Sequence, residues 1–191
     1  SLIVGYVLHE RISEAFDLYQ KMQENEVYPS GHTLVALVKA CIQMNDVRKV
    51  HDEVVRKGFE TDIFVGSSLI DKYIKYNSLS EALRLFDLLS VRNVVTWNML
   101  IAGYAEQDGF SYEAINCLMQ MELDGICPDD ATFVGMLKAS SAMKHIEGGR
   151  ILHTEILLRG LEREISIGNT LIDMYAKCKY ISEAVFIFKK M

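Results

Sequence analysis

Short apolar segments recur along the chain, each about three helical turns long and each followed by a polar break and a second amphipathic segment. Each first segment opens on a pair of large apolar residues. These pairs are Leu2-Ile3, Leu37-Val38, Leu69-Ile70, Leu100-Ile101, Met136-Leu137 and Leu171-Ile172. Apolar residues at helical spacing predict amphipathic helices, and no window alternates strictly enough to predict a strand. The pattern therefore predicts an all-α chain built from helix pairs.

Two stretches repeat almost letter for letter at an offset of 102 residues. Residues 68–75 read SLIDKYIK and residues 170–177 read TLIDMYAK. The offset continues in Ser80-Glu81-Ala82 and Ser182-Glu183-Ala184, so a whole helix pair recurs. Fixed-period self-similarity is the signature of a repeat array. We therefore predict an α-solenoid of stacked antiparallel helix-turn-helix repeats.

Turn residues divide this single array into pairs of unequal length. Proline at Pro29 and Pro128 and glycine at Gly58 and Gly160 mark helix ends. The predicted repeats are a partial one at 1–30, complete ones at 31–62, 63–93, 94–129 and 130–164, and a partial one at 165–191. Three consecutive repeats of 31, 36 and 35 residues together make the 102-residue period.

Two of these repeats depart in length from the repeating pattern. Repeat 31–62 is three residues shorter than its counterpart 130–164. Alignment of the two places the deletion around Gln43 to Arg48, in the turn between helices. Repeat 94–129 has one extra residue near Asp108-Gly109. Turns accept length changes best, so we expect the stack to survive both.

Composition and charge limit the kinds of partner and the cellular compartment that are expected for this chain. A net charge of −6 argues against indiscriminate nucleic-acid binding but leaves room for a basic strip. No apolar run approaches membrane-spanning length, so no membrane partner is expected. The cysteines form no C-x-x-C pair, which indicates a reducing compartment. They are Cys41, Cys117, Cys127 and Cys178.

A His-x-Glu pattern, half of the zinc deaminase signature, occurs twice, at His51 and His153. The rest of the signature, P-C-x-x-C, is missing from this sequence, and both copies stand at one equivalent position of a second helix. Repeat packing explains them better than zinc does. We predict no metal, no cofactor, no small-molecule substrate and no enzyme activity for this chain. Tyr73, Tyr104 and Tyr175 are likewise expected to pack between helix pairs.

The repeats resemble those of the plant pentatricopeptide repeat family. Residues 94–104, VVTWNMLIAGY, look like the opening of a P motif. Residues 131–139 and 148–153 resemble an L motif, whereas 63–71 and 165–173 resemble S motifs. The order is P, L, S, P, L, S, that of the PLS class. The resemblance implies a right-handed superhelix whose first helices line a concave surface, with single-stranded RNA as partner and one base per repeat.

In this family the fifth and last residues of a repeat choose the base. The resemblance carries these roles to Ser67 with Asn93, which would read adenine, and to Asn98 with Asp129, which would read uracil. The partial repeats offer two more base-reading residues. These are Asn169, for a pyrimidine, and Ser30, for cytosine if its missing partner is asparagine.

The L repeats should discriminate poorly, because an apolar fifth residue forms no hydrogen bond. Their fifth and last residues are Val35 with Asp62 and Val134 with Glu164. The implied core is 5′-weak-A-U-weak-pyrimidine-3′. Second residues of the repeats should flank the bases. They are His32, Phe64, Val95, Ala131 and Ser166.

Lys75 and Lys177 occupy the thirteenth position of the S motifs, and we assign them to phosphate neutralisation. More ordinary interpretations compete with these assignments. Asparagine and serine near a helix start often act as caps, and isolated lysines are usually solvated surface charges.

Together these expectations describe a sequence-selective RNA-binding module. It would be the target-recognition part of a plant C-to-U RNA-editing or RNA-processing factor in the mitochondrion or chloroplast, with editing-factor proteins as further partners. A transit peptide and any deaminase domain would lie outside this sequence. The alternative is a protein-binding scaffold of tetratricopeptide type. Such scaffolds keep a uniform period of about 34 residues and their own Trp-Leu-Gly-Tyr pattern, and this chain has neither.

Overall fold

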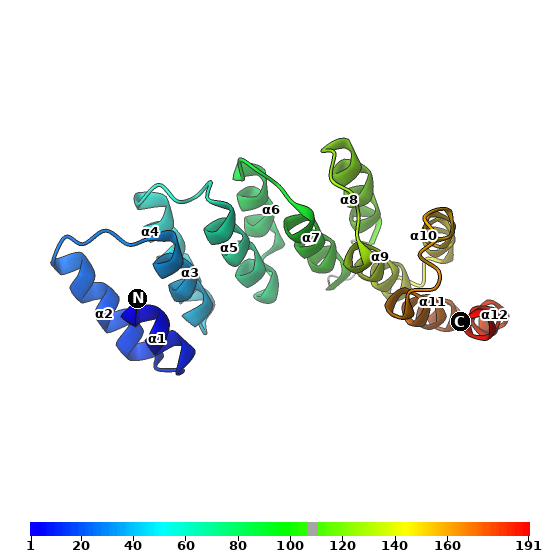
Figure 1. Ribbon diagram of the computed structural model, residues 1–191, viewed down its shortest axis with the longest axis horizontal. Helices are drawn as coiled ribbons and strands as arrows, with labels where there is room; N and C mark the ends of the chain where they lie inside the picture. Colours follow the sequence, from blue (N-terminus) through cyan, green and yellow to red (C-terminus); the bar gives the residue numbers. More distant parts are fainter. Residues whose placement is uncertain (107–110) are drawn as a thin grey trace. The chain divides into compact units, whose positions relative to one another are not determined.

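The computed structural model describes residues 1–106 and 111–191, and these residues form twelve α-helices and no β-strand (Figure 1). The helices are α1 (Leu2–Leu8), α2 (Ile12–Glu24), α3 (Gly31–Ala40), α4 (Met44–Arg56), α5 (Ile63–Lys75), α6 (Leu79–Leu88), α7 (Val94–Glu106), α8 (Ser111–Leu123), α9 (Asp130–Ala142), α10 (Ile146–Leu158), α11 (Ile165–Lys177) and α12 (Ile181–Lys190). None of those in the described ranges has the length and apolar character needed to cross a membrane. The turn at Asp108-Gly109 lies outside the described residues.

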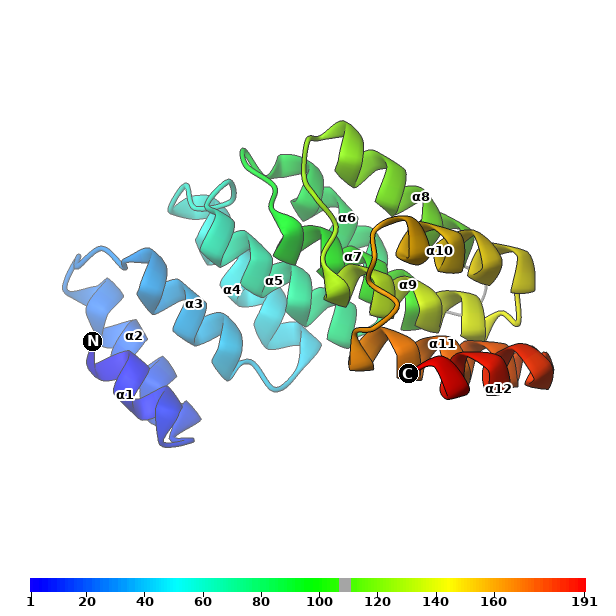
Figure 2. The ribbon, with the colours of Figure 1, turned by 45° about the vertical axis from the view of Figure 1, so that its right-hand side comes forward.

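The chain divides into two compact units, Ser1–Arg92 and Asn93–Met191. In the first unit α1, α3 and α5 pack against one another in sequence order, and in the second α7, α9 and α11 do so. Each of these first helices also packs on the second helix that follows it, so every pair folds back on itself (Figure 2). Each unit is therefore a short stack of antiparallel helix pairs.

The recurring apolar pairs form the core of each stack. In the first unit Leu37, Leu69 and Ile70 have no exposed surface, and in the second Ile101 and Leu137 have none. Burying one such side chain contributes about 1.5–3 kcal/mol relative to leaving it exposed. Neighbouring first helices therefore hold each stack together along its length.

Most turns end a helix with one residue of positive φ. Between the two helices of a pair these are Glu10, Asn77, Lys144 and Lys179, with φ from 53° to 67°. After second helices Gly58, Gly125 and Gly160 take the same conformation, with φ from 69° to 75°. Glycine adopts this conformation without the steric penalty that a Cβ imposes. The prediction that Gly58 and Gly160 mark helix ends is confirmed.

The turn between α3 and α4 is built differently. Helix α3 has 10 residues and its counterpart α9 has 13, whereas α4 and α10 both have 13. The three-residue deletion therefore removes the last turn of the first helix. Its placement at Gln43 to Arg48 is wrong, because α4 begins at Met44 in the same register as α10. Sequence alignment alone did not distinguish a shorter helix from a shorter turn.

Candidate nucleic-acid interface

The last residue of each predicted repeat begins the first helix of the next. Ser30, Asp62 and Asp129 are the N-cap residues of α3, α5 and α9, and each side chain accepts a hydrogen bond from a backbone amide one turn ahead. Glu164 is the N-cap residue of α11, but its side chain makes no capping bond. The capping interpretation is therefore correct for Ser30, and Asp62 and Asp129 cap their helices in the same way. Capping also holds these side chains at a fixed point of each repeat junction.

One predicted base-reading pair is in direct contact. The Asn98 amide donates through Nδ2 to Asp129 Oδ1 at 2.9 Å, although the two residues lie 31 positions apart. Thr132, in the first turn of α9, donates through its hydroxyl to Asn98 Oδ1 at 2.7 Å. Asp129 is exposed and Asn98 half-buried, whereas Thr132 is fully buried. A buried hydroxyl thus supports two polar groups that reach the surface.

The Asp129 carboxylate is held in its ionised form. Burial by itself raises the pKa of Asp129, but hydrogen bonds donated by the Asn98 amide and by Thr132 outweigh burial and lower the pKa below 3.8. The Thr132 amide and Asp129 Oδ1 are 3.0 Å apart, and the Asp129 amide donates back to Thr132 Oγ1 at 3.0 Å. This reciprocal arrangement is a capping box, and it fixes the carboxylate relative to α9.

The other complete predicted base-reading pair, Ser67 with Asn93, has one residue in each of the two compact units. Ser67 donates from Oγ to the Phe64 carbonyl at 3.2 Å. Asn93 accepts the Thr96 amide on Oδ1 at 3.0 Å, directly before α7. Their joint reading of a base stays a prediction. Asn169, the single reading residue of the last repeat, is exposed on α11.

Four predicted site residues, three from repeat 31–62 and one from repeat 63–93, line one cavity of about 500 Å³. They are the base-flanking His32 and Phe64 and the fifth and last residues Val35 and Asp62. Apolar side chains of α1 complete the wall, and the Phe64 ring is 73% exposed. Such a cavity suits a flat ring, while Val35 supplies no hydrogen bond to recognise its edge. That this predicted L repeat holds a base without selecting it stays a prediction.

The remaining base-flanking residues are accessible. Val95 is 52% exposed, and Ala131 and Ser166 are also exposed. Val134 of the second predicted L repeat is half-buried and Glu164 is exposed. No contact in the described part of the chain assigns these five residues to a base.

Both predicted phosphate-binding lysines are held by an aspartate on their own helix. Lys75 Nζ lies 2.8 Å from Asp71 Oδ2, and Lys177 Nζ lies 2.8 Å from Asp173 Oδ2. All four side chains are exposed to solvent. Exposed pairs at this spacing contribute about 0.3–0.5 kcal/mol, so a phosphate could displace the aspartate at little cost.

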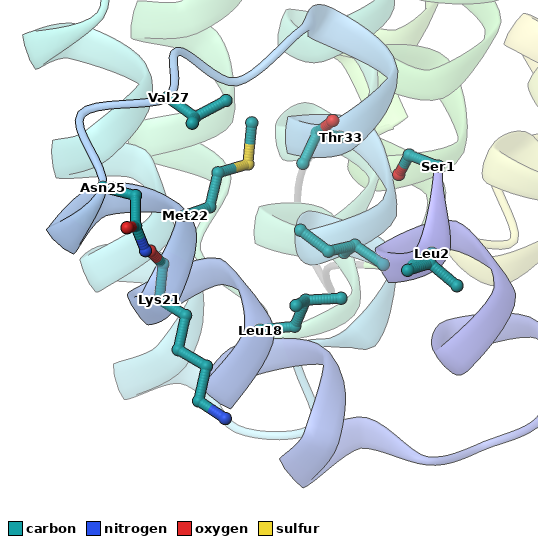
Figure 3. A pocket seen from close by; sticks show the side chains of 9 residues that line it. Ser1, Leu2, Leu18, Lys21, Met22, Asn25, Val27 and Thr33 are labelled. Carbon is teal, nitrogen blue, oxygen red and sulfur yellow. The ribbon is translucent and has the colours of Figure 1, made fainter.

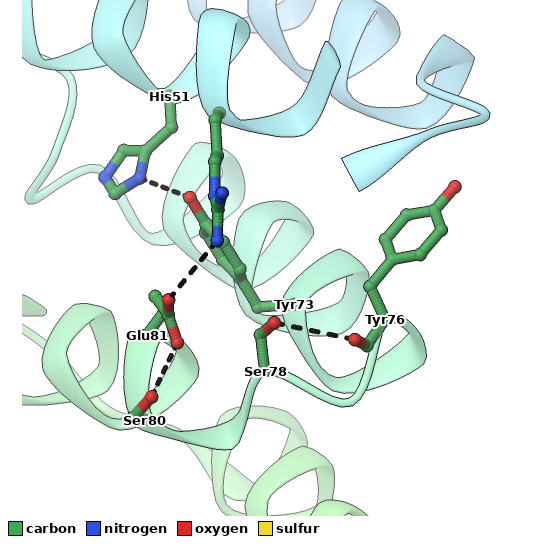
Figure 4. A network of polar contacts seen from close by, with 7 residues as sticks. His51, Tyr73, Tyr76, Ser78, Ser80 and Glu81 are labelled. Atoms are coloured by element: carbon green, nitrogen blue, oxygen red, sulfur yellow. Dashed lines mark hydrogen bonds and ion pairs between the residues drawn. The ribbon is translucent and has the colours of Figure 1, made fainter. Parts of the chain in front are cut away.

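The His-x-Glu histidines are packing residues. His51 Nδ1 lies 2.7 Å from the Tyr73 hydroxyl, and His153 Nδ1 lies 2.9 Å from that of Tyr175. Figure 4 shows the His51 side chain of α4 pointing toward the Tyr73 hydroxyl of α5, with a dashed line for their hydrogen bond. Tyr73 and Tyr175 are buried, which confirms that they pack between helix pairs. No group of three or more His, Cys, Asp or Glu that could hold a metal occurs among the described residues.

A second cavity lies beside α2 at the start of the first unit. It measures about 410 Å³, and Leu2, Leu18, Met22 and Val27 supply most of its apolar lining (Figure 3). None of the predicted site residues lines it. Its wall also lacks a convergent set of charged groups, so we assign no site there.

Comparison with known proteins settles the family. A model described as PPR repeat matches residues 1–27, 67–94 and 169–191, and a model described as PPR repeat family matches residues 92–141. Together these segments cover more than half of the chain. The chain belongs to the pentatricopeptide repeat family. The tetratricopeptide alternative is therefore wrong, while the PLS class and the repeat boundaries stay predictions.

Curated relatives come from Arabidopsis thaliana. Pentatricopeptide repeat-containing protein At2g13600 is 33% identical over 187 residues, which are 96% of this chain and 27% of that protein. Protein At4g25270, chloroplastic, is 33% identical over all of this chain and 36% of its own length. The chain spans about a quarter to a third of the length of such relatives.

Solved structures show the same fold. The pentatricopeptide repeat protein PPR10 from maize superposes with a TM-score of 0.82 over 100% of this chain and 28% of its own, at 21% identity. PPR10 in complex with an 18-nt psaJ RNA element gives 0.76 over 98% of this chain and 29% of its own, also at 21% identity. The α-solenoid fold expected from the repeats is confirmed.

Sequence reasoning missed one set of residues in this pentatricopeptide repeat chain. Thr33, Thr96 and Thr132 each stand three residues after the last residue of a repeat, and all three are buried. A signal for them was present, since a Ser, Asn or Asp followed three residues later by a polar residue resembles a capping box. Nothing in the sequence showed that Thr132 also reaches a residue of the preceding repeat.

Proposed function

We propose that the chain is a sequence-selective, single-stranded RNA-binding module in which each repeat contacts one base. The contact between Asn98 and Asp129 carries the proposal. The fifth and last residues of repeat 94–129 are joined at 2.9 Å, with the carboxylate at the surface. Side chains held in this way have little freedom to lose when a base arrives. The RNA complex of PPR10 supports RNA as the ligand of this fold.

The chemistry of the pair suits uracil. One N–H of the Asn98 amide is used by Asp129, and Asn98 Oδ1 accepts the Thr132 hydroxyl. The second N–H and the second lone pair of the amide remain as one donor beside one acceptor. Uracil presents an N–H next to a carbonyl on its pairing edge, which matches this order.

The other repeats extend the proposed sequence. Ser67 with Asn93 would read adenine, and Asn169 would read a pyrimidine. The cavity around Val35 would hold a base with little preference. The proposed core is 5′-weak-A-U-weak-pyrimidine-3′. Each good base contact contributes about 1–3 kcal/mol of discrimination, so the core alone gives modest selectivity.

The whole protein would use this module to find its target. Relatives named as chloroplastic and mitochondrial support a plant organelle as its location. We propose that it serves C-to-U editing or RNA processing, with the chemistry supplied elsewhere and with editing-factor proteins as partners. The chain has a net charge of −6, so its RNA affinity should depend on the neighbouring repeats as well.

The test exchanges the base-reading pair. In the double variant Asn98→Ser with Asp129→Asn, the pair becomes that proposed for adenine. We expect the preferred base at this position to change from uracil to adenine, measured by fluorescence anisotropy with four RNAs that differ at one base. Asn45→Ser, exposed on α4, is the control and should keep the uracil preference. An unchanged uracil preference in the double variant would show that this pair does not read the base.

A further inference from the structure

We infer that Thr132 sets the uracil preference of the repeat before it, by holding the Asn98 amide in one of its two orientations. This inference rests on the proposed function. It makes Thr132 a positioning residue, because its hydroxyl acts through Asn98 and not on the base. The residue belongs to repeat 130–164, whereas the base position that it controls belongs to repeat 94–129.

Buried threonines mark a particular kind of repeat junction. Thr33, Thr96 and Thr132 are 3%, 0% and 0% exposed and follow the ends of P and S repeats. After the two L repeats the same helix position holds Val65 and Ile167, which are equally buried. The site therefore accepts a β-branched side chain with or without a hydroxyl. Since a buried hydroxyl needs a hydrogen-bond partner, the threonines point to a polar role at P and S junctions.

The partners of the threonines differ. Thr96 Oγ1 donates to the Asn93 carbonyl at 2.9 Å, and Thr33 Oγ1 lies 3.0 Å from Ser30 Oγ. Thr132 reaches beyond its own helix start. Its Oγ1 lies 2.7 Å from Asn98 Oδ1 and 3.0 Å from Asp129 Oδ1. The hydroxyl has one proton, and the shorter distance directs that proton to Asn98.

Two contacts together fix the amide of Asn98. Asn98 Nδ2 donates a hydrogen bond to Asp129 Oδ1, and the Thr132 hydroxyl donates one to Asn98 Oδ1. Rotating the amide by half a turn would bring Asn98 Oδ1 against the Asp129 carboxylate and Nδ2 against the threonine hydroxyl. The orientation of an asparagine amide is decided by such a network. With the orientation fixed, the order of donor and acceptor offered to a base is fixed too.

The order of donor and acceptor on the Asn98 amide distinguishes uracil from cytosine. Uracil presents an N–H at N3 beside the carbonyl at C4, whereas cytosine presents an acceptor at N3 beside the amino group at C4. A fixed amide therefore pairs well with one of the two, and an amide free to turn accepts both. The inferred role of Thr132 is to prevent that turn.

The experiment compares Thr132→Val with Thr132→Ser. Valine keeps the shape and removes the hydroxyl, so the uracil-to-cytosine affinity ratio should fall about threefold to tenfold, the effect of one hydrogen bond. Serine keeps the hydroxyl and should keep the ratio. Thr96→Val is the matched control and should leave this position unchanged. RNAs differing only at the uracil position give the ratio, and thermal unfolding reports whether each variant is folded.

Two outcomes separate this inference from the proposed function. If the wild-type chain shows no uracil preference at this position, the proposed function fails and the inference fails with it. If the wild-type chain prefers uracil and folded Thr132→Val keeps the full ratio, only the inference is overturned. Should Thr132→Val unfold, Thr132→Ala provides a second hydroxyl-free variant with the same expected loss.

Discussion

The two predicted L repeats, 31–62 and 130–164, end their first helices in different ways. Helix α9 continues to Ala142 and α3 stops at Ala40, although the second helices that follow are equal in length. An α-helix leaves its last carbonyl groups without partners inside the helix, and these groups need other donors. The two copies differ in which groups donate hydrogen bonds to these last carbonyls.

The longer copy uses its own backbone. Lys144 takes a φ of 53°, and its amide donates to the Ser141 carbonyl at 3.1 Å. The His145 amide donates to the Ser140 carbonyl at 3.0 Å. This left-handed turn closes α9 without help from another repeat.

In the shorter copy, a side chain of the next repeat caps the end of the first helix. Lys72 of α5 donates from Nζ to the carbonyls of Lys39 at 3.0 Å and Cys41 at 2.6 Å. Cys41 itself is extended, with φ −61° and ψ 122°, so the chain leaves the helix without a left-handed residue. A positive charge is favourable at a helix C-terminus, which adds to the effect of the hydrogen bonds.

The residues around this site differ in a coordinated way. The repeat after the first copy has Lys72, and the repeat after the second copy has Met174 at the same position, where it is fully buried. Where the first has buried Val47, the second has Gly149, and a Cβ added at Gly149 would lie 2.5 Å from the Met174 sulfur. A deletion in one repeat is thus compensated by a residue of its neighbour.

The largest effect should come from Lys72→Met, which puts beside the shorter α3 the residue that stands beside α9. The carbonyls of Lys39 and Cys41 lose their charged donor, and we expect the free energy of unfolding to fall by about 1–3 kcal/mol. Urea denaturation measures the loss. Lys75→Met, on the solvent side of the same helix, should cost less than about 0.5 kcal/mol. Equal midpoints for Lys72→Met and wild type would mean that the cap contributes nothing.

A smaller effect should appear on acidification. Burial lowers the pKa of His51 below 6.5, with Asp52 acting in the opposite direction, whereas burial and Lys190 both lower the pKa of His153. Below pH 6.5 the unfolded chain therefore binds more protons than the folded chain, and stability falls as the pH falls. Urea titrations at a series of pH values should show this slope.

Single variants show how much each histidine contributes to this dependence of stability on pH. His153→Gln should flatten the pH dependence more than His51→Gln, because no opposing carboxylate acts on His153. Both variants also lose the contact to a tyrosine, so the slope and not the absolute stability is compared. If both variants keep the wild-type slope below pH 6.5, another group causes the acid sensitivity.

The smallest effect concerns the paired lysines. Lys75→Gln and Lys177→Gln should change stability by less than about 0.5 kcal/mol each. If each lysine neutralises a phosphate, each variant should reduce the slope of log affinity against log salt by roughly 0.7. Asp71→Asn releases Lys75 from its ion pair and should strengthen RNA binding. An unchanged salt slope in both lysine variants would leave them as surface charges.

Much of the site could be predicted because it follows from local rules. Helix periodicity placed Asn98 on a first helix, and the turn after Pro128 placed Asp129 at the next helix start. The contact between them depends on the packing of α7 against α9. The third member, Thr132, could not be assigned from its spacing, because the same position elsewhere holds Val65 and Ile167. Only the distances showed that Thr132 contacts Asn98, the fifth residue of the preceding predicted repeat, whereas Thr33 and Thr96 contact the residue three positions before them.

The sequence by itself determined that this chain is a stack of helix pairs, since a repeated apolar pattern has no other way to bury its surface. It also determined the family, through motifs that recur at fixed intervals. The tertiary structure decided that the deletion shortens α3, that Lys72 closes the shortened helix and that Thr132 fixes Asn98. The contacts of Lys72 and of Thr132 join atoms more than 30 residues apart in sequence. Contacts of this kind arise from packing between repeats, and a pattern within one repeat does not contain them.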